Sequence, residues 1–151
     1  MREFKGRAVI PGTCKGEALV TKTGLNVLAT YVKSLMDADG SCICNDINNK
    51  DLYGKAIGGG ILCIPQTIGS TSAGFMLQAV AAAGLQPKAL LYARPAEPLV
   101  LAGILVADIW EDTRIITIDD LGQDFLDSVR DGDEIEIQLD GTVRVYSPPS
   151  A

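Results

Sequence analysis

Residues 60–75 decide the fold, and their sequence is GILCIPQTIGSTSAGF. The run begins with apolar and β-branched residues, which is typical of a buried strand, and Pro65 and Gly69 then favour a loop. Hydroxyl side chains, which are preferred at the start of helices, occupy positions 70–72. The stretch therefore predicts a strand, a loop and a helix in that order. The helix is indicated by residues that recur after four and three positions, namely Met76, Val80 and Ala83.

The start of the predicted helix is suited to binding an anion. The first turn of a helix presents backbone N–H groups without intrahelical partners and the positive end of the helix dipole. A carboxylate or phosphate would be attracted there, beside the hydroxyls of Ser70, Thr71 and Ser72. The alternative is that these hydroxyls only cap the helix, which is worth about 1 kcal/mol to folding. The residues alone leave both functions open.

A second buried strand is predicted at residues 89–93, because this apolar run follows the helix-ending Gly84. A strand, a helix and a second strand in succession predict a right-handed βαβ unit with parallel strands. Ligands of such units bind at the carboxyl ends of the strands, which places Ser70 and Arg94 near one another. Arg94 can hold a carboxylate with two parallel N–H donors, or it can form an ion pair with a neighbouring acid such as Glu97.

The remainder of the chain predicts a mixed α/β domain. Residues 99–107 are apolar nearly all round, which favours a buried helix. Asp119 and Asp120 are expected to cap a short helix, and Asp140 with Gly141 favours a hairpin turn. We expect one domain over residues 1–147 and a tail at 148–151. Further strands are predicted at 4–10, 16–21, 114–118, 134–139 and 142–146. Cys14 and Lys15 are expected on the connection between the first two of these strands.

Residues 24–51 carry weaker signals. Residues 24–39 allow one helix, and residues 37–51 are rich in Asp, Asn, Gly and Ser, which favours an exposed, mobile loop. Cys42 and Cys44 invite comparison with a metal site, but closed metal sites usually need four ligands. A structural role is favoured because buried cysteine behaves as a small hydrophobe, so no metal site is predicted. The apolar face of the helix would hold Leu25, Leu28, Val32 and Leu35.

Composition excludes several classes of function. The 151 residues carry a net charge of −6, which disfavours nucleic acid and anionic membranes as partners because both attract a surplus of Lys and Arg. The longest apolar run, residues 98–109, is too short to span a bilayer, and the N-terminus has no export signal. We therefore expect a soluble, cytoplasmic protein with reduced thiols. Histidine is absent, which excludes a Ser-His-Asp triad, a His-ligated zinc site and a phosphohistidine carrier built from this chain alone.

Several motifs resemble those of one known family. They are GRAVIPG at 6–12, GEALV at 16–20, DLYGK at 51–55, GST at 69–71, GDEIEI at 132–137 and DGTV at 140–143. Together they resemble the small, swivel-domain subunit of the aconitase X family, and the last two are similar to the end of aconitase swivel domains in general. The resemblance covers nearly the whole chain, and residues 51–72 are its most specific part. It implies an α/β fold, a swivelling β/β/α domain of the aconitase swivel type.

The resemblance also implies a role in catalysis. Members of the family dehydrate hydroxy acids, and a separate large subunit holds an iron–sulfur cluster and makes most substrate contacts. No cofactor is therefore expected on this chain. The general base of the family is the serine of the Gly-Ser loop, which matches Ser70, and the helix start and Arg94 are means to stabilise its alkoxide. Gly69, Thr71 and Ser72 are expected to contact the substrate, with Ser72 favoured as a helix cap.

The identity of the substrate is left to the resemblance. The leading candidate is cis-3-hydroxy-L-proline, dehydrated to a pyrroline carboxylate. Within the family the alternative is phosphomevalonate, but the relatives that use it have basic and glycine residues where this chain has Gln66, Thr67 and Ile68. Residues 24–49 also lack the Gly-Gly-Val-Asp stretch expected in many relatives. An alternative of another class is a non-catalytic anion-binding or regulatory module without a hydro-lyase partner.

Overall fold

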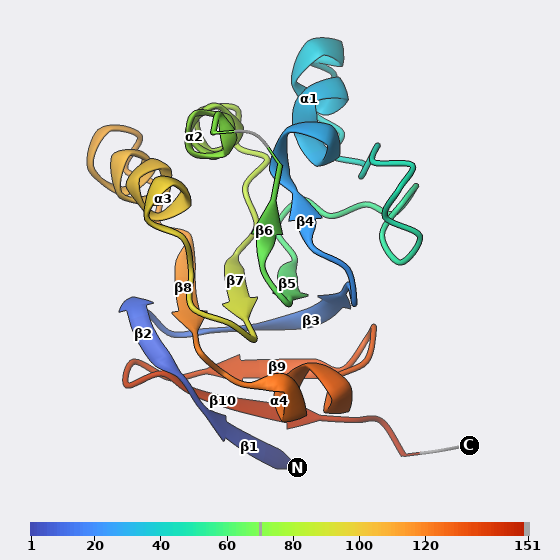
Figure 1. Cartoon of the computed structure of the whole chain (residues 1–151), viewed down its shortest axis with the longest axis vertical. Coiled ribbons are helices and arrows are strands. Elements are labelled where there is room, and N and C mark those ends of the chain that lie inside the picture. The colour runs from blue at the N-terminus through green and yellow to red at the C-terminus, as the bar shows by residue number, and fades with distance from the viewer. Residues whose placement is uncertain (70, 150–151) are drawn as a thin grey trace.

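The main β-sheet closes into a barrel that is nearly complete. In this computed structural model, which describes residues 1–69 and 71–149, its strands are β1 (Arg2–Lys5), β2 (Arg7–Ile10), β3 (Cys14–Val20), β5 (Ile61–Ile64), β7 (Ala89–Tyr92), β8 (Ile116–Asp119), β9 (Glu134–Ile137) and β10 (Thr142–Tyr146). Their spatial order is β1-β10-β9-β3-β5-β7-β8-β2. Because β1 and β2 follow each other in sequence but end opposite edges of this order, the sheet curves round on itself (Figure 1). A second, two-stranded sheet holds β4 (Leu25–Asn26) and β6 (Thr67–Ile68).

Gly6 is the point at which the chain passes from one edge of the sheet to the other. Its N–H donates to the Gly141 carbonyl at 3.0 Å, and a Cβ on Gly6 would lie 2.6 Å from the carbonyl oxygen of Asp119. No larger side chain fits between these neighbours. The single strand predicted over residues 4–10 is therefore wrong, because β1 pairs with β10 and β2 pairs with β8.

Parallel strands in the middle of the sheet separate two hydrophobic cores. β3, β5, β7 and β8 run parallel, which confirms the predicted parallel pairing of the strands on either side of the central helix. Every residue of β5 and β7 is buried, so their apolar runs do not alternate with polar residues. Leu62 and Tyr92 enter the core under the helices, whereas Cys63 and Leu91 enter the core of the barrel.

Three helices cover one side of the sheet and a fourth lies against the barrel. In Figure 1, α1 (Val27–Asp37), α2 (Ala73–Ala82) and α3 (Pro98–Trp110) lie together at the top, and α4 (Gln123–Ser128) lies below. α2 and α3 touch through their backbones, since a Cβ on Gly103 would lie 2.1 Å from the carbonyl oxygen of Gly74. In α4, Phe125 packs edge-on against Phe4 at 5.3 Å. Among the described residues no helix is both long and apolar enough to cross a bilayer.

The buried face of α1 is not the predicted one. The helix lies within residues 24–39 as expected, but Leu28 is 36% exposed. Asn26, whose type weakens a helix interior, caps this one, because its Oδ1 accepts the Ala29 N–H at 3.1 Å. The residues that face the core are Val27, Thr30, Tyr31 and Ser34.

Asp119 is a buried carboxylate that pairs with the exposed Arg7 side chain instead of capping a helix as predicted. It is completely buried at the end of β8, and its two carboxylate oxygens accept Arg7 Nε at 2.9 Å and Nη2 at 2.6 Å. Oδ2 also accepts the Ala96 N–H at 2.7 Å. The N-cap residue of α4 is Gly122, which has a φ of +92°. Neither Asp119 nor Asp120 therefore caps that helix.

Two further segments differ from expectation in their surroundings. Cys14 and Lys15 belong to β3, where they pair with β9, so neither lies on a free connection. Residues 37–51 are more buried than their composition predicts, because Cys42 and Cys44 lie in the core beneath the helices. This placement agrees with the packing role expected for both thiols, and burial raises the pKa of each.

The helix α3 is not buried all round, although its apolar sequence predicts this. Val100, Ile104 and Ala107 face the core. Leu99 and Trp110 are 58% and 74% exposed on the other side of the helix. Part of its apolar surface therefore has no cover within the described chain.

Candidate functional site

The loop before α2 is fixed by a glycine that no other residue can replace without strain. β6 pairs in parallel with β4, which brings Gly69 against the start of α1. Gly69 has a φ of +102°, and a Cβ there would lie 2.9 Å from Asn26 Nδ2. Ser70, the predicted base, lies outside the described residues, between Gly69 and Thr71. Its two neighbours in the sequence, Gly69 and Thr71, are both exposed.

The start of α2 differs from the predicted capped helix. Ser72 occupies the N-cap position with helical backbone angles, a φ of −81° and a ψ of 0°, and its side chain makes no capping hydrogen bond. Ser72 therefore holds the expected N-cap position, but its side chain does not make the hydrogen bond of a typical cap to the helix backbone. Thr71 is exposed and lines a groove of about 230 Å³ between α2 and α3. The other lining residues are Gly74, Phe75, Gln78, Leu99, Ala102, Gly103 and Val106.

Arg94 contacts the base of the loop. It follows β7, and its Nη1 donates to Gln66 Oε1 at 3.3 Å, three residues before Gly69. Among residues 1–69 and 71–149 no carboxylate lies within ion-pair distance of Arg94, so the alternative pairing with Glu97 is not formed. The guanidinium is exposed and can still attract an anion. β6 leads from this contact to the start of α2 (Figure 1).

Two buried hydroxyls lie beneath the loop and were missed by sequence reasoning. Thr67, in β6, is 2% exposed, and Tyr92, at the end of β7, is 0% exposed. Neither hydroxyl has a hydrogen-bond partner among the described residues. Burial raises the pKa of Tyr92, and the nearby Thr67 hydroxyl opposes that rise. The sequence signal for these two buried hydroxyls is the tyrosine that ends the otherwise aliphatic strand ALLY at 89–92.

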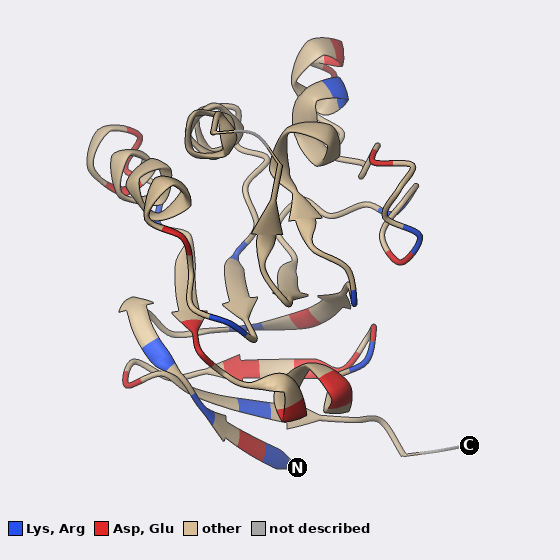
Figure 2. Cartoon of the chain, in the orientation of Figure 1, with Lys and Arg blue, Asp and Glu red and all other residues tan. Residues whose placement is uncertain are grey.

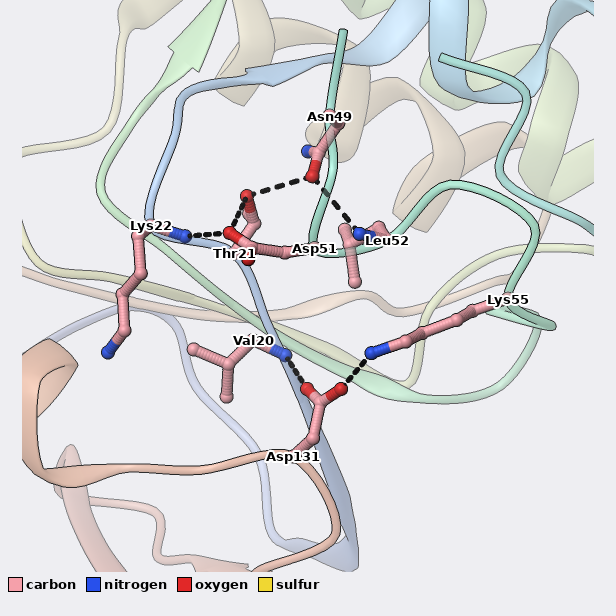
Figure 3. Close-up of polar contacts among 8 residues, drawn as sticks. All are labelled: Val20, Thr21, Lys22, Asn49, Asp51, Leu52, Lys55 and Asp131. Atoms are coloured by element: carbon pink, nitrogen blue, oxygen red, sulfur yellow. Dashed lines mark hydrogen bonds and ion pairs between the residues drawn. The ribbon is translucent and has the colours of Figure 1, made fainter. Parts of the chain in front are cut away.

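Asp51 and Lys55, from the motif that carries the family resemblance, act as structural anchors (Figure 3). Asp51 Oδ2 accepts the Lys22 N–H at 2.8 Å, and Lys55 forms an ion pair with Asp131. The other oxygen of Asp131 accepts the Val20 N–H at 2.6 Å. A hollow of about 320 Å³ beside them is lined by three basic and three acidic side chains, so it has no preference for one sign of charge. These contacts tie the segment to the end of β3.

The described residues form no metal centre. Nowhere in residues 1–69 and 71–149 do three or more His, Cys, Asp or Glu side chains gather so that they could hold a metal ion. Three of the thiols, Cys42, Cys44 and Cys63, are buried, and Cys14 is half-buried. Cys63 is completely buried as predicted, and burial raises the pKa of its thiol.

Comparison of the sequence with known protein families identifies the family of this chain. Residues 3–145 match the aconitase X swivel domain. The chain belongs to this family. The predicted family and the predicted swivel fold are both confirmed, and the match covers nearly all of the described residues.

Relatives of this aconitase X swivel domain are dehydratase subunits. The chain is 35% identical over 95 residues to the phosphomevalonate dehydratase small subunit of Aeropyrum pernix, covering 63% of this chain and 67% of that protein. Identity to the corresponding subunit of Pyrococcus furiosus is 31% over 107 residues, covering 71% and 74%. The subunit of Methanocella arvoryzae is 27% identical over 143 residues, covering 95% and 96%. The chain is therefore a swivel subunit of a hydro-lyase family.

Solved structures support the swivel fold. The crystal structure of Thermococcus kodakaraensis aconitase X matches with a TM-score of 0.79 and 24% identity, over 97% of this chain and 100% of that chain. At this identity the likeness shows the fold alone. The solution structure of a UPF0107 protein matches with a TM-score of 0.74 and 26% identity, again over 97% and 100% of the two chains.

Proposed function

We propose that this chain is the small subunit of a two-subunit dehydratase in which Ser70 is the general base. Gly69 is the observation that carries the proposal. Its φ of +102° and the absence of space for a side chain fix the backbone on the N-terminal side of Ser70, three residues before the N-cap of α2. Family membership supports a catalytic role for a serine at this point.

The chemistry proposed for Ser70 needs support from its surroundings, because a serine hydroxyl is a weak base. Ser70 would take the proton next to the substrate carboxylate, and the positive end of the ten-residue α2 would stabilise the resulting alkoxide. No Asp, Glu, Lys or Arg occurs between positions 56 and 87. No charged side chain of this segment would therefore compete with the helix dipole for the alkoxide. Thr71 and Arg94 are suited to orienting substrate oxygens. Thr71 follows Ser70 in the sequence, and Arg94 contacts Gln66 at the start of the loop.

Departure of the substrate hydroxyl requires chemistry that this chain does not contain. An iron–sulfur cluster supplies a Lewis acid for that hydroxyl when it is bound. The described residues offer no ligand set for a cluster, so we assign it to a large partner subunit. The isolated small subunit is therefore expected to be inactive.

Phosphomevalonate is the substrate that we favour. The curated relatives with 27–35% identity are phosphomevalonate dehydratase subunits, which reverses the order suggested by the sequence alone. The exposed Arg94, without a carboxylate partner among the described residues, is a suitable group for a phosphate. cis-3-Hydroxy-L-proline is the second candidate, because residues 66–68 contain no basic side chain for a phosphate.

The test is reconstitution with the large subunit. The co-purified complex would be assayed with both substrates, and faster turnover of phosphomevalonate is expected. Ser70→Ala should lower kcat by about 10²- to 10⁴-fold, while the free energy of unfolding changes by no more than about 1 kcal/mol. Ser128→Ala, at the end of α4, is the matched control and should leave kcat unchanged.

Two outcomes would overturn the proposal. Near-normal turnover by the Ser70→Ala complex would remove Ser70 from the mechanism. Failure of any cluster-containing subunit to co-purify would favour a non-catalytic anion-binding module. Preference for cis-3-hydroxy-L-proline would correct the substrate and leave the role of Ser70 in place.

A further inference from the structure

The outer side of α2 and α3 is an exposed apolar surface. Phe75, Leu99, Ile109 and Trp110 are 78%, 58%, 71% and 74% exposed. Large contiguous apolar patches are rare on monomeric proteins and usually mark a site of interaction. Ile109 and Trp110 extend the groove-lining side of α3, because they follow Leu99 by about three helical turns. We call this surface the α2–α3 face, and it consists of Phe75, Gln78, Leu99, Ala102, Val106, Ile109 and Trp110.

The α2–α3 face has almost no charge, although the chain as a whole carries −6. α2 contains no charged residue, and the one charge within α3 is Asp108, which is paired with Arg114 at 2.7 Å. In Figure 2 both helices are tan over most of their length, whereas the barrel strands carry blue and red segments. Depletion of charge together with exposed Trp and Phe is the composition of a protein–protein interface core.

The groove in this surface is preformed. Gly74 and Gly103 lie in its wall, and the backbones of the two helices are in contact there. Phe75 and Leu99 flank the groove from opposite helices. A partner side chain can therefore enter without a prior rearrangement of the helices.

The position of the face favours one occupant. Thr71 lines the groove directly beside Ser70, so a protein that covers the groove also covers the start of α2. In the proposed reaction the substrate reaches Ser70 from the large subunit. A second copy of this chain on the same face would instead cover the start of α2 and exclude the large subunit from it.

We propose that the large subunit docks on the α2–α3 face, with Phe75 and Trp110 as its main anchors. The proposal rests on the proposed function, because it takes the dehydratase large subunit as the partner. Truncation of an aromatic anchor at an interface costs at least a factor of about 30 in Kd.

The test measures the Kd between the purified small subunit and the cluster-loaded large subunit by titration calorimetry. Phe75→Ser and Trp110→Ser should each raise the Kd by about 30-fold or more. Ile47→Ser and Leu139→Ser are the matched controls, because these side chains are 72% and 65% exposed outside the face, and they should leave the Kd within about threefold. Circular dichroism checks that all four variants are folded.

The outcomes separate this proposal from the proposed function. If both aromatic variants bind like the wild type, or if the controls lose as much affinity, the docking proposal is overturned even when the wild-type complex is active. A small-subunit homodimer that Phe75→Ser dissociates, without an effect on large-subunit binding, would also overturn it. If the wild-type complex forms through this face but dehydrates neither substrate, the proposed function fails and the docking surface stands.

Discussion

The barrel strands and the α2–α3 face meet solvent in opposite ways. Three ion pairs lie on or beside β1 and β10, namely Arg2 with Asp133 at 3.7 Å, Lys5 with Asp140 at 3.0 Å and Glu3 with Arg144 at 2.9 Å. Charged side chains on such strands discourage pairing with strands of other molecules. The α2–α3 face has apolar side chains in their place. The barrel strands thus favour contact with water, whereas the α2–α3 face has the composition of a surface that contacts protein.

Asp119→Ala gives the largest expected effect and tests whether the charged half depends on its buried carboxylate. The substitution leaves the Ala96 N–H and the Arg7 guanidinium without their acceptor. We expect a loss of about 2–3 kcal/mol in the free energy of unfolding, measured by urea denaturation, because the Ala96 N–H is left buried without an acceptor while the exposed Arg7 side chain can be solvated. Asp119→Asn keeps an acceptor oxygen and should lose less. A loss below about 1 kcal/mol for Asp119→Ala would mean that the barrel does not rely on this pair.

Gly103→Ala is expected to have the second largest effect and tests the uncharged half. The new Cβ would collide with the Gly74 carbonyl, so α2 and α3 must separate. Overpacking of this kind costs about 1–3 kcal/mol, which chemical denaturation would detect. Ala102→Ser, at the exposed neighbouring position, is the control and should change stability little. Equal stability of the two variants would show that the helices are not in close contact.

Asp140→Asn gives the smallest expected effect, because Asp140 is fully exposed. A hydrogen bond from Lys5, followed by one from Thr142, lowers the pKa of Asp140 to about 2. Because the pKa is lower in the folded state, the stabilisation is complete above the unfolded pKa of about 4 and is lost as the pH falls through the folded pKa of about 2. The melting temperature of the variant should therefore be slightly lower than that of the wild type at about pH 6, and the difference should shrink as the pH falls from about 4 to below about 2. A constant difference across this range would exclude ionisation of Asp140 as the cause.

The parts of the fold that follow from neighbouring residues could be predicted from the sequence. The strand, helix and strand around residues 60–93 and the hairpin at Asp140 follow from local patterns, and the structure has them. The break at Gly6 depends on Asp119, and Asp119 itself pairs with Arg7, 112 positions away. No local pattern contains such distant partners.

The candidate site was predictable to a similar extent. The order of loop, hydroxyls and helix places Gly69 and Thr71 correctly beside the start of α2. Ser72 takes the expected N-cap position but has helical backbone angles there, which residue type alone does not determine. The buried hydroxyls of Thr67 and Tyr92 come from two segments that lie together only in the folded protein.

The pairing of β1 with β10 has a consequence for how the protein is made. Arg2–Lys5 are synthesised well before their hydrogen-bonding partners on β10, Thr142–Tyr146. The barrel can therefore close only after β10 has emerged from the ribosome, and until then the growing polypeptide carries unpaired strand edges. Loss of β10 through a premature stop codon would leave β1 and β9 without their common neighbour, and the ribosome would release a product that proteases can readily degrade.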